Sequence, residues 1–317
     1  MKRYITIDGG TTNTRIYLVS DNKVVQTVKL SIGAKDNADG SDNYKTQIKD
    51  SIQKILKDNS LETRNIECIL ASGMITSEYG LYNLPHIETP AGIEELHNGL
   101  HKTVFSEICE IPFVFIPGVV TKSSDFEETD MMRGEETEIF GFDTDKISDS
   151  LYILPGSHSK WIIIDTNGKI SSIKTMLTGE MIATLSNNTI LKDAIDLSVD
   201  SFCVEYLQKG YDYANNYGIN EALFKVRILK NKFNLGKIQL YSFFMGAVLH
   251  GEIKRAEKTN VKRIIVGGKR ILRECTVALL KNVVKAEIID AGDFSETTTP
   301  YGAVKIFEYN WIFYRWF

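Results

Sequence analysis

The stretch Ile7-Asp-Gly-Gly-Thr-Thr-Asn-Thr-Arg15 joins two short runs of β-forming residues near the start of the chain. These runs, Tyr4–Ile7 and Arg15–Val19, are predicted strands, and Lys23–Leu30 is a third because apolar and polar residues alternate along it. Asp21-Asn22 supplies the tight turn between the second and third strands. The sequence therefore predicts a three-stranded meander whose first connection is rich in glycine and hydroxyl groups.

A similar order of elements recurs in the second half of the chain. Leu151–Leu154, Lys160–Ile164 and Lys169–Leu177 are predicted strands, and Pro155-Gly-Ser-His-Ser159 joins the first two. A repeat of this size indicates a duplicated domain and not a solenoid, with a chance similarity of two ordinary meanders as the alternative. Between and after the meanders strands alternate with helices, which indicates α/β domains.

Length and composition narrow the class of protein. The chain has 317 residues, 43% of them hydrophobic, and this length suggests about two domains. Polar residues cluster between residues 141 and 150, so the predicted domains are residues 1–143 and 144–317. The formal net charge of −4 argues against nucleic acid as the main partner. Scattered cysteines without a CxxC pair argue against a zinc site, and no signal-peptide pattern or run of ~20 apolar residues is found, so we expect a cytoplasmic protein with no membrane contact.

The first glycine-rich connection carries the groups that a phosphate site needs. Glycine lets a ligand approach the backbone closely, and N–H groups and hydroxyls donate hydrogen bonds to an anion. Asp8, at the end of a strand, could hold Mg²⁺ directly or through water, and Arg15 could add a positive charge. The residues predicted to bind a nucleotide here are Asp8, Gly10, Thr11, Thr12, Asn13 and Arg15. A plain hairpin turn is the alternative interpretation.

The second connection repeats this chemistry. The residues predicted to bind the nucleotide here are Gly156, Ser157, His158 and Lys160. Two such loops facing one another would grip a triphosphate from both sides. Gly179 and Glu180, which follow the second meander, could contact the nucleotide and Mg²⁺, although Glu180 could equally cap a helix.

A third glycine pair follows the predicted strand Val261–Val266. The backbone of Gly267-Gly268 would let a flat ring such as adenine lie against it. A tight turn between a strand and a helix is the alternative. These two glycines are therefore candidates for the adenosine end of a nucleotide.

Carboxylates and cations elsewhere could complete a site for phosphoryl transfer. Transfer to a hydroxyl needs a carboxylate that accepts the hydroxyl proton and cations that neutralise charge on the moving group. Glu135 or Glu136, at the start of a predicted helix, could be this base, although carboxylates there are also common electrostatic caps. Arg133 could bind an anionic part of the substrate or a phosphate. Arg227 is a second candidate cation, with an ordinary surface arginine as the alternative.

Four motifs together resemble one family of kinases. They are Ile7-Asp-Gly-Gly-Thr-Thr-Asn-Thr-Arg15, Met132-Arg-Gly-Glu-Glu-Thr137, Leu154-Pro-Gly-Ser-His-Ser-Lys-Trp161 and Met176-Leu-Thr-Gly-Glu180. The chain resembles the 2-dehydro-3-deoxygalactonokinase family, within the superfamily of acetate and sugar kinases, heat-shock chaperones and actin. The first motif indicates the wider superfamily, and the second and third are specific to the family.

The resemblance implies an α/β fold of two ribonuclease-H-like domains, as in actin-like ATPases, with the active site in the cleft between them. It implies phosphoryl transfer from ATP, with Mg²⁺, to the 6-hydroxyl of 2-dehydro-3-deoxy-D-galactonate in galactonate catabolism. The first domain would hold one phosphate loop and the sugar acid, and the second would hold the other loop and adenosine. The substrate contacts would be Gly73, Met74, Arg133 and Arg227. The partners would be these small molecules, and the family also allows a homodimer.

The chain departs from the superfamily pattern at two places. Pro155 stands where many members begin the second loop with an aspartate, so the metal role rests more heavily on Asp8. A glutamate stands where related sugar kinases have an aspartate base. A kinase of another 2-keto-3-deoxy acid, such as 2-dehydro-3-deoxygluconate, and a non-kinase nucleotide-binding protein of the same fold are the alternatives.

Overall fold

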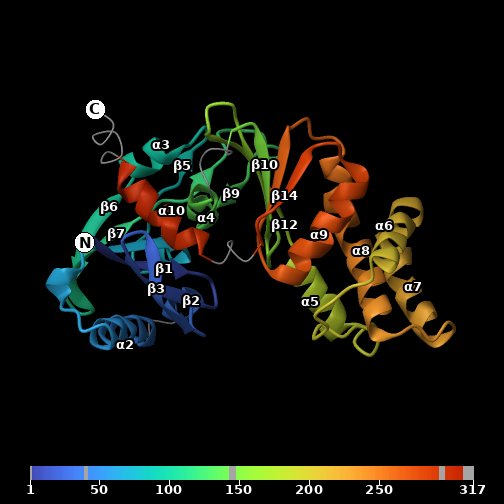
Figure 1. Ribbon diagram of the computed structural model, residues 1–317, viewed down its shortest axis with the longest axis horizontal. Helices are drawn as coiled ribbons and strands as arrows, with labels where there is room; N and C mark the ends of the chain where they lie inside the picture. The colour runs from blue at the N-terminus through green and yellow to red at the C-terminus, as the bar shows by residue number, and fades with distance from the viewer. Residues whose placement is uncertain (1, 39–41, 143–147, 293–296, 310–317) are drawn as a thin grey trace. The chain divides into compact units, whose positions relative to one another are not determined.

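The computed structural model describes residues 2–38, 42–142, 148–292 and 297–309 (Figure 1). Their contacts divide the chain into two compact units. The first unit comprises the described residues within 1–148, 164–173 and 294–317, and the second comprises those within 149–163 and 174–293. The boundary predicted between residues 143 and 144 lies outside the described residues. The cytoplasmic location and the homodimer stay predictions.

The first unit is built on a six-stranded sheet with the strand order β3-β2-β1-β4-β7-β6. Its strands are β1 (Arg3–Gly9), β2 (Thr14–Ser20), β3 (Lys23–Leu30), β4 (Ile69–Gly73), β6 (His101–Phe105) and β7 (Cys109–Phe115). β1 pairs antiparallel with β2 and parallel with β4, and Gly9 lies opposite Gly73. The loops that follow β1 and β4 therefore emerge side by side at the carboxyl ends of two parallel strands.

Helices cover both faces of this sheet (Figure 1). They are α1 (Lys35–Ala38), α2 (Asn43–Asp58), α3 (Ile93–Asn98), α4 (Glu135–Gly141) and α10 (Thr298–Phe307). On one face, Ile5 of β1 is buried in a core with Ile48 of α2. On the other face, the ring of Tyr4 contacts Phe307 of α10. Because side chains alternate along a strand, Asp8 shares the face of Tyr4, on which α10 packs.

A small second sheet leads the chain into α4. It has the order β5-β8-β9, with strands β5 (Ile87–Glu88), β8 (Val119–Val120) and β9 (Met131–Met132). Two turns of 3-10 helix, η1 (Thr63–Asn65) and η2 (Met74–Thr76), flank β4. Since β9 ends at Met132 and α4 begins at Glu135, the small sheet sets the position at which α4 starts.

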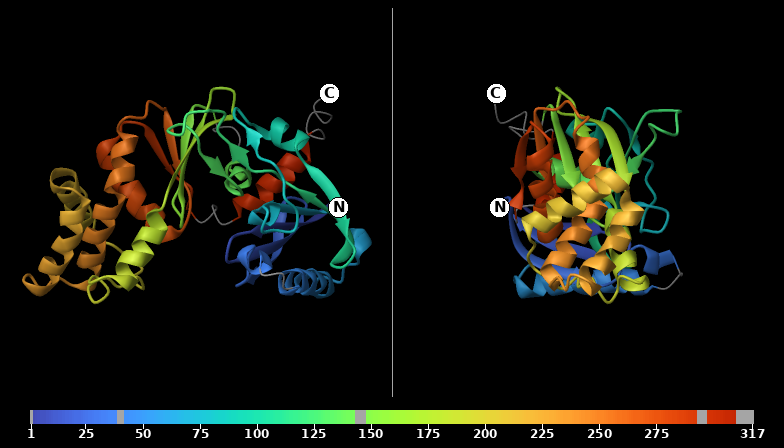
Figure 2. Two further views of the ribbon diagram at one scale, coloured as in Figure 1. Left: turned by 180° about the vertical axis from the view of Figure 1, so that it is seen from behind. Right: turned by 90° about the vertical axis from the view of Figure 1, so that its right-hand side faces the viewer.

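The second unit is built on a five-stranded sheet with the order β12-β11-β10-β13-β14, although residue 164 and residues 170–173 of this sheet belong to the first unit. Its elements are β10 (Ser150–Leu154), β11 (Ser159–Ile164), β12 (Ile170–Met176), α5 (Thr178–Asn188), α6 (Val204–Tyr217), α7 (Ile219–Asn231), α8 (Lys237–Ala256), β13 (Arg263–Val266), α9 (Arg270–Val283) and β14 (Glu287–Asp290). β10, β13 and β14 are parallel neighbours. The helices α6, α7 and α8 pack together (Figures 1 and 2), and α8 contributes many of the largest side chains to the core.

The predicted repeat is confirmed at the level of strand order. The order β3-β2-β1-β4 of the first unit matches β12-β11-β10-β13 of the second, and in each unit the first strand has a parallel neighbour. Each hydroxyl-rich loop therefore follows the strand at which the sheet changes from the meander to its parallel part. This is the position at which open α/β sheets commonly bind ligands.

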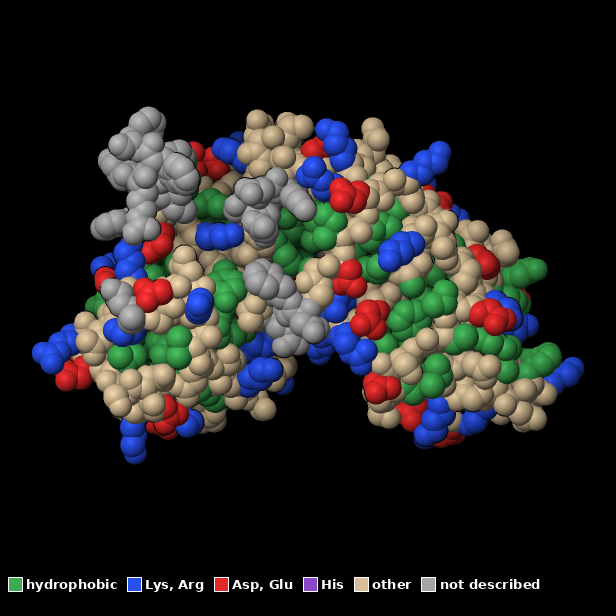
Figure 3. Space-filling view, in the orientation of Figure 1, with side chains coloured by type: hydrophobic (Ala, Val, Ile, Leu, Met, Phe, Trp, Pro, Cys, Tyr) green, Lys and Arg blue, Asp and Glu red, His purple; other side chains and the backbone are tan. Residues whose placement is uncertain are grey.

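The surface of the described residues carries mixed charge. On the face in Figure 3, positive and negative side chains are interspersed over both units. No helix among the described residues meets the length and apolarity that crossing a membrane requires.

Two glycines allow α10 to pack closely on α4. A Cβ atom at Gly302 would lie 1.8 Å from the carbonyl oxygen of Thr137, and one at Gly141 would lie 1.9 Å from that of Thr298. Contacts this short cannot exist with any side chain at either position. Close packing of α10 therefore fixes the position of α4, the helix that carries the candidate base.

We expect Gly302→Ala to lower the free energy of unfolding by about 1–3 kcal/mol, because α10 must move away from α4. Gly251→Ala is the matched control, since Gly251 also lies within a helix but a Cβ atom added there would have no atom within 4 Å. There alanine should stabilise by up to about 1 kcal/mol through helix propensity. Urea unfolding followed by circular dichroism measures both. Equal effects of the two substitutions would contradict the close α4–α10 contact.

Candidate functional site

The loop after β1 is a tight turn with exposed donors. The N–H of Gly10 donates to the carbonyl of Asn13 at 2.8 Å, and the carbonyls of Gly10 and Thr11 accept hydrogen bonds from Ala34 and Lys35. Residues 11–13 are exposed, and the N–H groups of Thr11 and Thr12 have no hydrogen-bond partner among the described residues. The carbonyl groups of the loop are therefore used in hydrogen bonds within the protein, while its N–H groups and hydroxyls remain available to a ligand. A phosphate site requires such donors.

Asp8 lies at the carboxyl end of β1 and pairs with Arg15 of β2. Arg15 Nη1 donates to Asp8 Oδ2 at 2.9 Å, across the register that places the two residues opposite each other. Burial raises the pKa of Asp8 above its usual value, and the charge of Arg15 opposes that shift. The side chain of Asp8 is 20% exposed, so a part of it remains accessible beside the loop.

Three backbone segments meet beside this loop without side chains between them. A Cβ atom at Gly73 would lie 2.6 Å from the carbonyl oxygen of Gly9, and one at Gly134 would lie 3.2 Å from the Cα of Gly73. Gly73 and Gly134 also have φ values of 83° and 117°, which favour glycine. The start of α4 is thereby brought against the ends of β1 and β4.

The first turn of α4 carries three glutamates in different surroundings. Glu136 is fully buried, and both of its carboxylate oxygens accept the N–H of Gly134, at 2.9 and 2.8 Å. Burial, followed by the charge of Glu135, raises the pKa of Glu136 to about 8. Glu135 is only half-buried, and its Oε2 accepts the N–H of Arg133 at 3.1 Å. Glu135 is therefore the more accessible of the two predicted bases.

Glu138 is a further acidic residue near the candidate site that the sequence prediction did not single out. Burial, followed by the charges of Glu135 and Asp8, raises the pKa of Glu138 to about 8, while Arg15 opposes the shift. The structure therefore brings Asp8, Arg15, Glu135 and Glu138 within electrostatic reach of one another. The signal for Glu138 was its spacing of three residues from Glu135, which places both on one face of a helix.

Arg133 joins separate segments of the first unit through hydrogen bonds. Its Nη1 donates to the carbonyl and the hydroxyl of Thr76, both at 2.7 Å, and its Nη2 donates to the carbonyl of Leu84 at 2.9 Å and lies 3.2 Å from Nδ1 of His86. Burial and the charge of Arg133 lower the pKa of His86 to about 4. These contacts favour a positioning role for Arg133 between the end of β9 and the loop after η2, over direct contact with an anion.

The predicted substrate residues Gly73 and Met74 lie at the junction of β4 and η2. Met74 is half-buried, and its carbonyl accepts the N–H and the hydroxyl of Ser77. This junction adjoins the start of α4 through the contact of Gly73 with Gly134. Gly73 thus lies against the residue that precedes Glu135, at the same edge of the sheet as the loop after β1.

In the second unit, three glycine-containing segments converge on the loop after β10. A Cβ atom at Gly179 would lie 2.3 Å from the carbonyl oxygen of Gly156, and one at Gly268 would lie 2.4 Å from that of Pro155. The N–H of Gly267 donates to the carbonyl of Ile153 at 2.9 Å. The structure therefore brings together the second loop, the start of α5 and the predicted adenosine glycines.

The side chains of this second loop have different partners. Ser157 and His158 are exposed, and His158 Nε2 lies 2.8 Å from Glu180 Oε1. Lys160 is 8% exposed, and its Nζ donates to the hydroxyl of Thr175 at 2.8 Å. The loop thus presents a serine and a histidine to solvent, while the lysine ammonium reaches the neighbouring strand β12.

Glu252 of α8 is a second group that the sequence prediction did not single out. It is 5% exposed, and its carboxylate accepts hydrogen bonds from Trp161 Nε1 at 3.1 Å and from the hydroxyl of Thr178. Burial raises its pKa to about 7. No local pattern indicates this contact, because Glu252 is distant in sequence from both donors.

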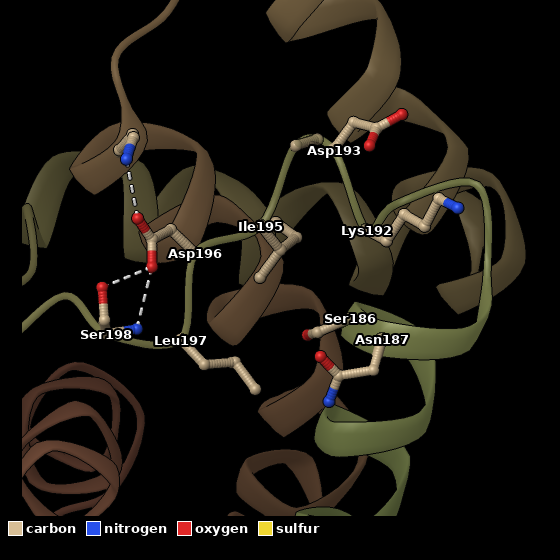
Figure 4. Close-up of a pocket in the computed structure, with 10 residues that line it drawn as sticks. Ser186, Asn187, Lys192, Asp193, Ile195, Asp196, Leu197 and Ser198 are labelled. Carbon is tan, nitrogen blue, oxygen red and sulfur yellow. Dashed lines mark hydrogen bonds and ion pairs between the residues drawn. The ribbon is translucent and has the colours of Figure 1, made fainter.

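A pocket of about 530 Å³ lies elsewhere in the second unit (Figure 4). Two of its charged groups form a pair: Asp196 accepts from Lys237 Nζ at 2.8 Å and from the hydroxyl and N–H of Ser198, and Lys237 lowers the pKa of Asp196. None of the predicted site residues lines it. Arg227 lies nearby, with its Nη1 donating to the carbonyl of Ile190 at 3.0 Å. The lining residues are Ser186, Asn187, Lys192, Asp193, Ala194, Ile195, Asp196, Leu197, Ser198 and Lys237.

Asp8 is the group that fits a magnesium ion. Mg²⁺ is usually held by one or two carboxylates together with water and substrate phosphates, not by a complete protein cage. Among the described residues no three histidine, cysteine or acidic side chains form a metal cluster, and Asp8 lies with a partly exposed carboxylate beside exposed N–H donors. The other predicted metal residue, Glu180, lies in the second unit next to His158.

Two solved structures share the fold of this chain. The crystal structure of a Sinorhizobium meliloti protein named for 2-dehydro-3-deoxygalactonokinase activity is 20% identical, covers 97% of this chain and 99% of its own, and has a TM-score of 0.77. The activator of the 2-hydroxyisocaproyl-CoA dehydratase from Clostridium difficile, with bound ADPNP, is 13% identical, covers 99% and 98%, and has a TM-score of 0.53. With the repeated strand order, these likenesses show that the protein has the two-domain α/β fold of the actin-like ATPases and sugar kinases.

The sequence places the chain more narrowly. The model of the 2-keto-3-deoxy-galactonokinase family matches residues 8–299, and the 2-dehydro-3-deoxygalactonokinase of Escherichia coli (strain K12) is 27% identical over 255 residues, which are 79% of each chain. The chain belongs to the 2-keto-3-deoxy-galactonokinase family and is a sugar-acid kinase. The family resemblance seen in the motifs is confirmed.

Proposed function

We propose that this kinase transfers the γ-phosphoryl group of ATP to the 6-hydroxyl of 2-dehydro-3-deoxy-D-galactonate, with Mg²⁺ as the metal. Membership of the family supports this substrate. The observation that carries the chemistry is the exposed glycine–threonine loop at the end of β1, with Asp8 beside it and the glutamates of α4 within electrostatic reach. A kinase needs these three groups together: donors for phosphates, a carboxylate for the metal and a carboxylate for the hydroxyl.

Both hydroxyl-rich loops bind phosphates of ATP in this proposal. The first supplies the N–H groups of Thr11 and Thr12, with Gly10, Asn13 and Arg15 shaping the turn and its charge. The second supplies the loop from Gly156 to His158, next to Gly179. Gly267-Gly268 would take the adenosine, since that turn already contacts the second loop. Asp8 would hold Mg²⁺ directly or through water, and the metal would neutralise charge on the phosphates.

Glu135 is the proton acceptor that the geometry supports best. A general base must reach the hydroxyl within hydrogen-bonding distance, and Glu136 is fully buried with both oxygens on the N–H of Gly134. Burial also raises the pKa of Glu136 to about 8, which favours its protonated form at pH 7 and disfavours a role as proton acceptor. The 6-hydroxyl oxygen attacks the γ-phosphorus, the bond from that phosphorus to the bridging oxygen breaks, ADP leaves, and the hydroxyl proton passes to Glu135. Gly73 and Met74 border this region as substrate contacts.

We expect Glu135→Gln to lower kcat by roughly 10²-fold or more, the range of general-base catalysis. Glu136→Gln should change kcat by less than about tenfold, because an amide resembles the protonated acid that Glu136 already is at pH 7. Steady-state kinetics at saturating ATP and sugar acid compares the two variants. The reverse pattern would assign the base to Glu136, and normal kcat in both would place it elsewhere.

A coupled assay of ADP release, run over a panel of 2-keto-3-deoxy acids, tests the substrate. We expect the highest kcat/KM with 2-dehydro-3-deoxy-D-galactonate, and a ³¹P spectrum of the product should show a phosphate ester on the 6-oxygen. Preference for 2-dehydro-3-deoxygluconate would move the assignment to that acid. ATP binding without turnover of any member of the panel would refute the proposal for this substrate class.

A further inference from the structure

The buried carboxylate of Glu252 lies on a face of α8 that is otherwise apolar. Its neighbours on the helix, Val248, Leu249, Ile253 and Ala256, are all buried. Placing a carboxylate among such side chains costs free energy that an apolar residue would not, unless hydrogen bonds offset the cost. Glu252 accepts two such hydrogen bonds, and their donors identify the segments that it holds together.

The two donors lie on either side of the second hydroxyl-rich loop. Trp161 belongs to β11, the strand that the loop enters, and its Nε1 donates to Oε2 of Glu252 at 3.1 Å. Thr178 is the first residue of α5, and its hydroxyl donates to Oε1. One carboxylate thus ties the strand after the loop to the helix that packs on the loop.

The first turn of α5 is in direct contact with the loop. The N–H of Glu180 donates to the carbonyl of Ser157 at 3.2 Å, and Glu180 Oε1 lies 2.8 Å from His158 Nε2. A Cβ atom at Gly179 would lie 2.7 Å from the Cα of Ser157, so the two segments leave no space between them. A shift of Thr178 must therefore move the loop from Gly156 to His158.

We propose that Glu252 is a positioning residue for the second phosphate loop, acting through Thr178 and Trp161 to set the affinity for ATP. This inference rests on the proposed binding of ATP phosphates by that loop. Glu252 does not touch the nucleotide. It fixes the loop before ATP arrives, so its loss reduces the binding of ATP and leaves the binding of the sugar acid, assigned to the first unit, unchanged.

The test compares Glu252→Gln with Glu257→Gln in the full chain. An amide at position 252 removes the carboxylate charge: its oxygen can still accept from Trp161 Nε1, but its NH2 group must donate to the hydroxyl of Thr178, which reverses that hydrogen bond. Both contacts then lose the strength that a charged acceptor gives. Glu257 lies directly after α8 and also accepts a hydrogen bond from an aromatic side chain, Tyr211 at 2.8 Å, but it has no contact with the loop. The readouts are the KM for ATP, the KM for the sugar acid and the Kd of a fluorescent ATP analogue.

We expect Glu252→Gln to raise the KM for ATP and the Kd of the analogue by about tenfold, the order of loss for a displaced binding group. The KM for the sugar acid should stay within about twofold of wild type, and Glu257→Gln should change neither constant. Trp161→Phe, which removes the indole donor together with part of the buried ring, should move the constants in the same direction and provides a second test if Glu252→Gln fails to fold.

Two outcomes overturn the inference. One is a folded Glu252→Gln or Trp161→Phe variant with unchanged constants for ATP, which would reduce Glu252 to a stabilising role. The other is an equal rise of both KM values. Failure of the wild-type protein to bind the analogue or ATP would instead refute the proposed function, and the inference with it.

Discussion

The close approach of three backbone segments at Gly9, Gly73 and Gly134 is the constraint on which the first unit's site depends. Any side chain at Gly73 would overlap the carbonyl oxygen of Gly9. Without this approach α4 could not begin next to the carboxyl ends of β1 and β4, and its glutamates would lie out of reach of Asp8. The fit of α10 against the back of α4, through Gly141 and Gly302, then fixes the helix in that place. Close backbone packing thus sets the position of the candidate site, and the charged side chains extend from these packed segments.

The two units use one strand order for different tasks. In the first unit the strand before the loop ends in Asp8, whose partly exposed carboxylate suits a metal. In the second unit Pro155 stands after the strand, and the loop is held by Gly179, by Gly268 and, through Thr178, by the buried Glu252. The two loops thus share glycine and hydroxyl chemistry, while the acidic group lies beside the first and the supporting contacts surround the second. This division accounts for the weight that the proposed mechanism places on Asp8.

Local patterns were enough to predict the strands of both meanders, the two loops and the helix that starts at Glu135. Turn residues and the two-residue period carry that information within a few positions. Contacts between segments that are distant in sequence produce no local pattern from which they could be predicted. The packing of α10 on α4, the four contacts of Arg133 around Thr76 and Leu84, and the hydrogen bonds of Glu252 all join residues far apart in sequence. The choice between Glu135 and Glu136 also needed the structure, because it depends on which side of the first helical turn meets the core.

A crystal structure of the protein with a non-hydrolysable ATP analogue, Mg²⁺ and the sugar acid examines the central claim most directly. We expect phosphate oxygens within hydrogen-bonding distance of the N–H groups of Thr11 and Thr12, the metal bound to Asp8 or to water on it, and the 6-hydroxyl within hydrogen-bonding distance of Glu135. A nucleotide whose phosphates lie away from residues 8–14, for example in the pocket around Asp196, would contradict it.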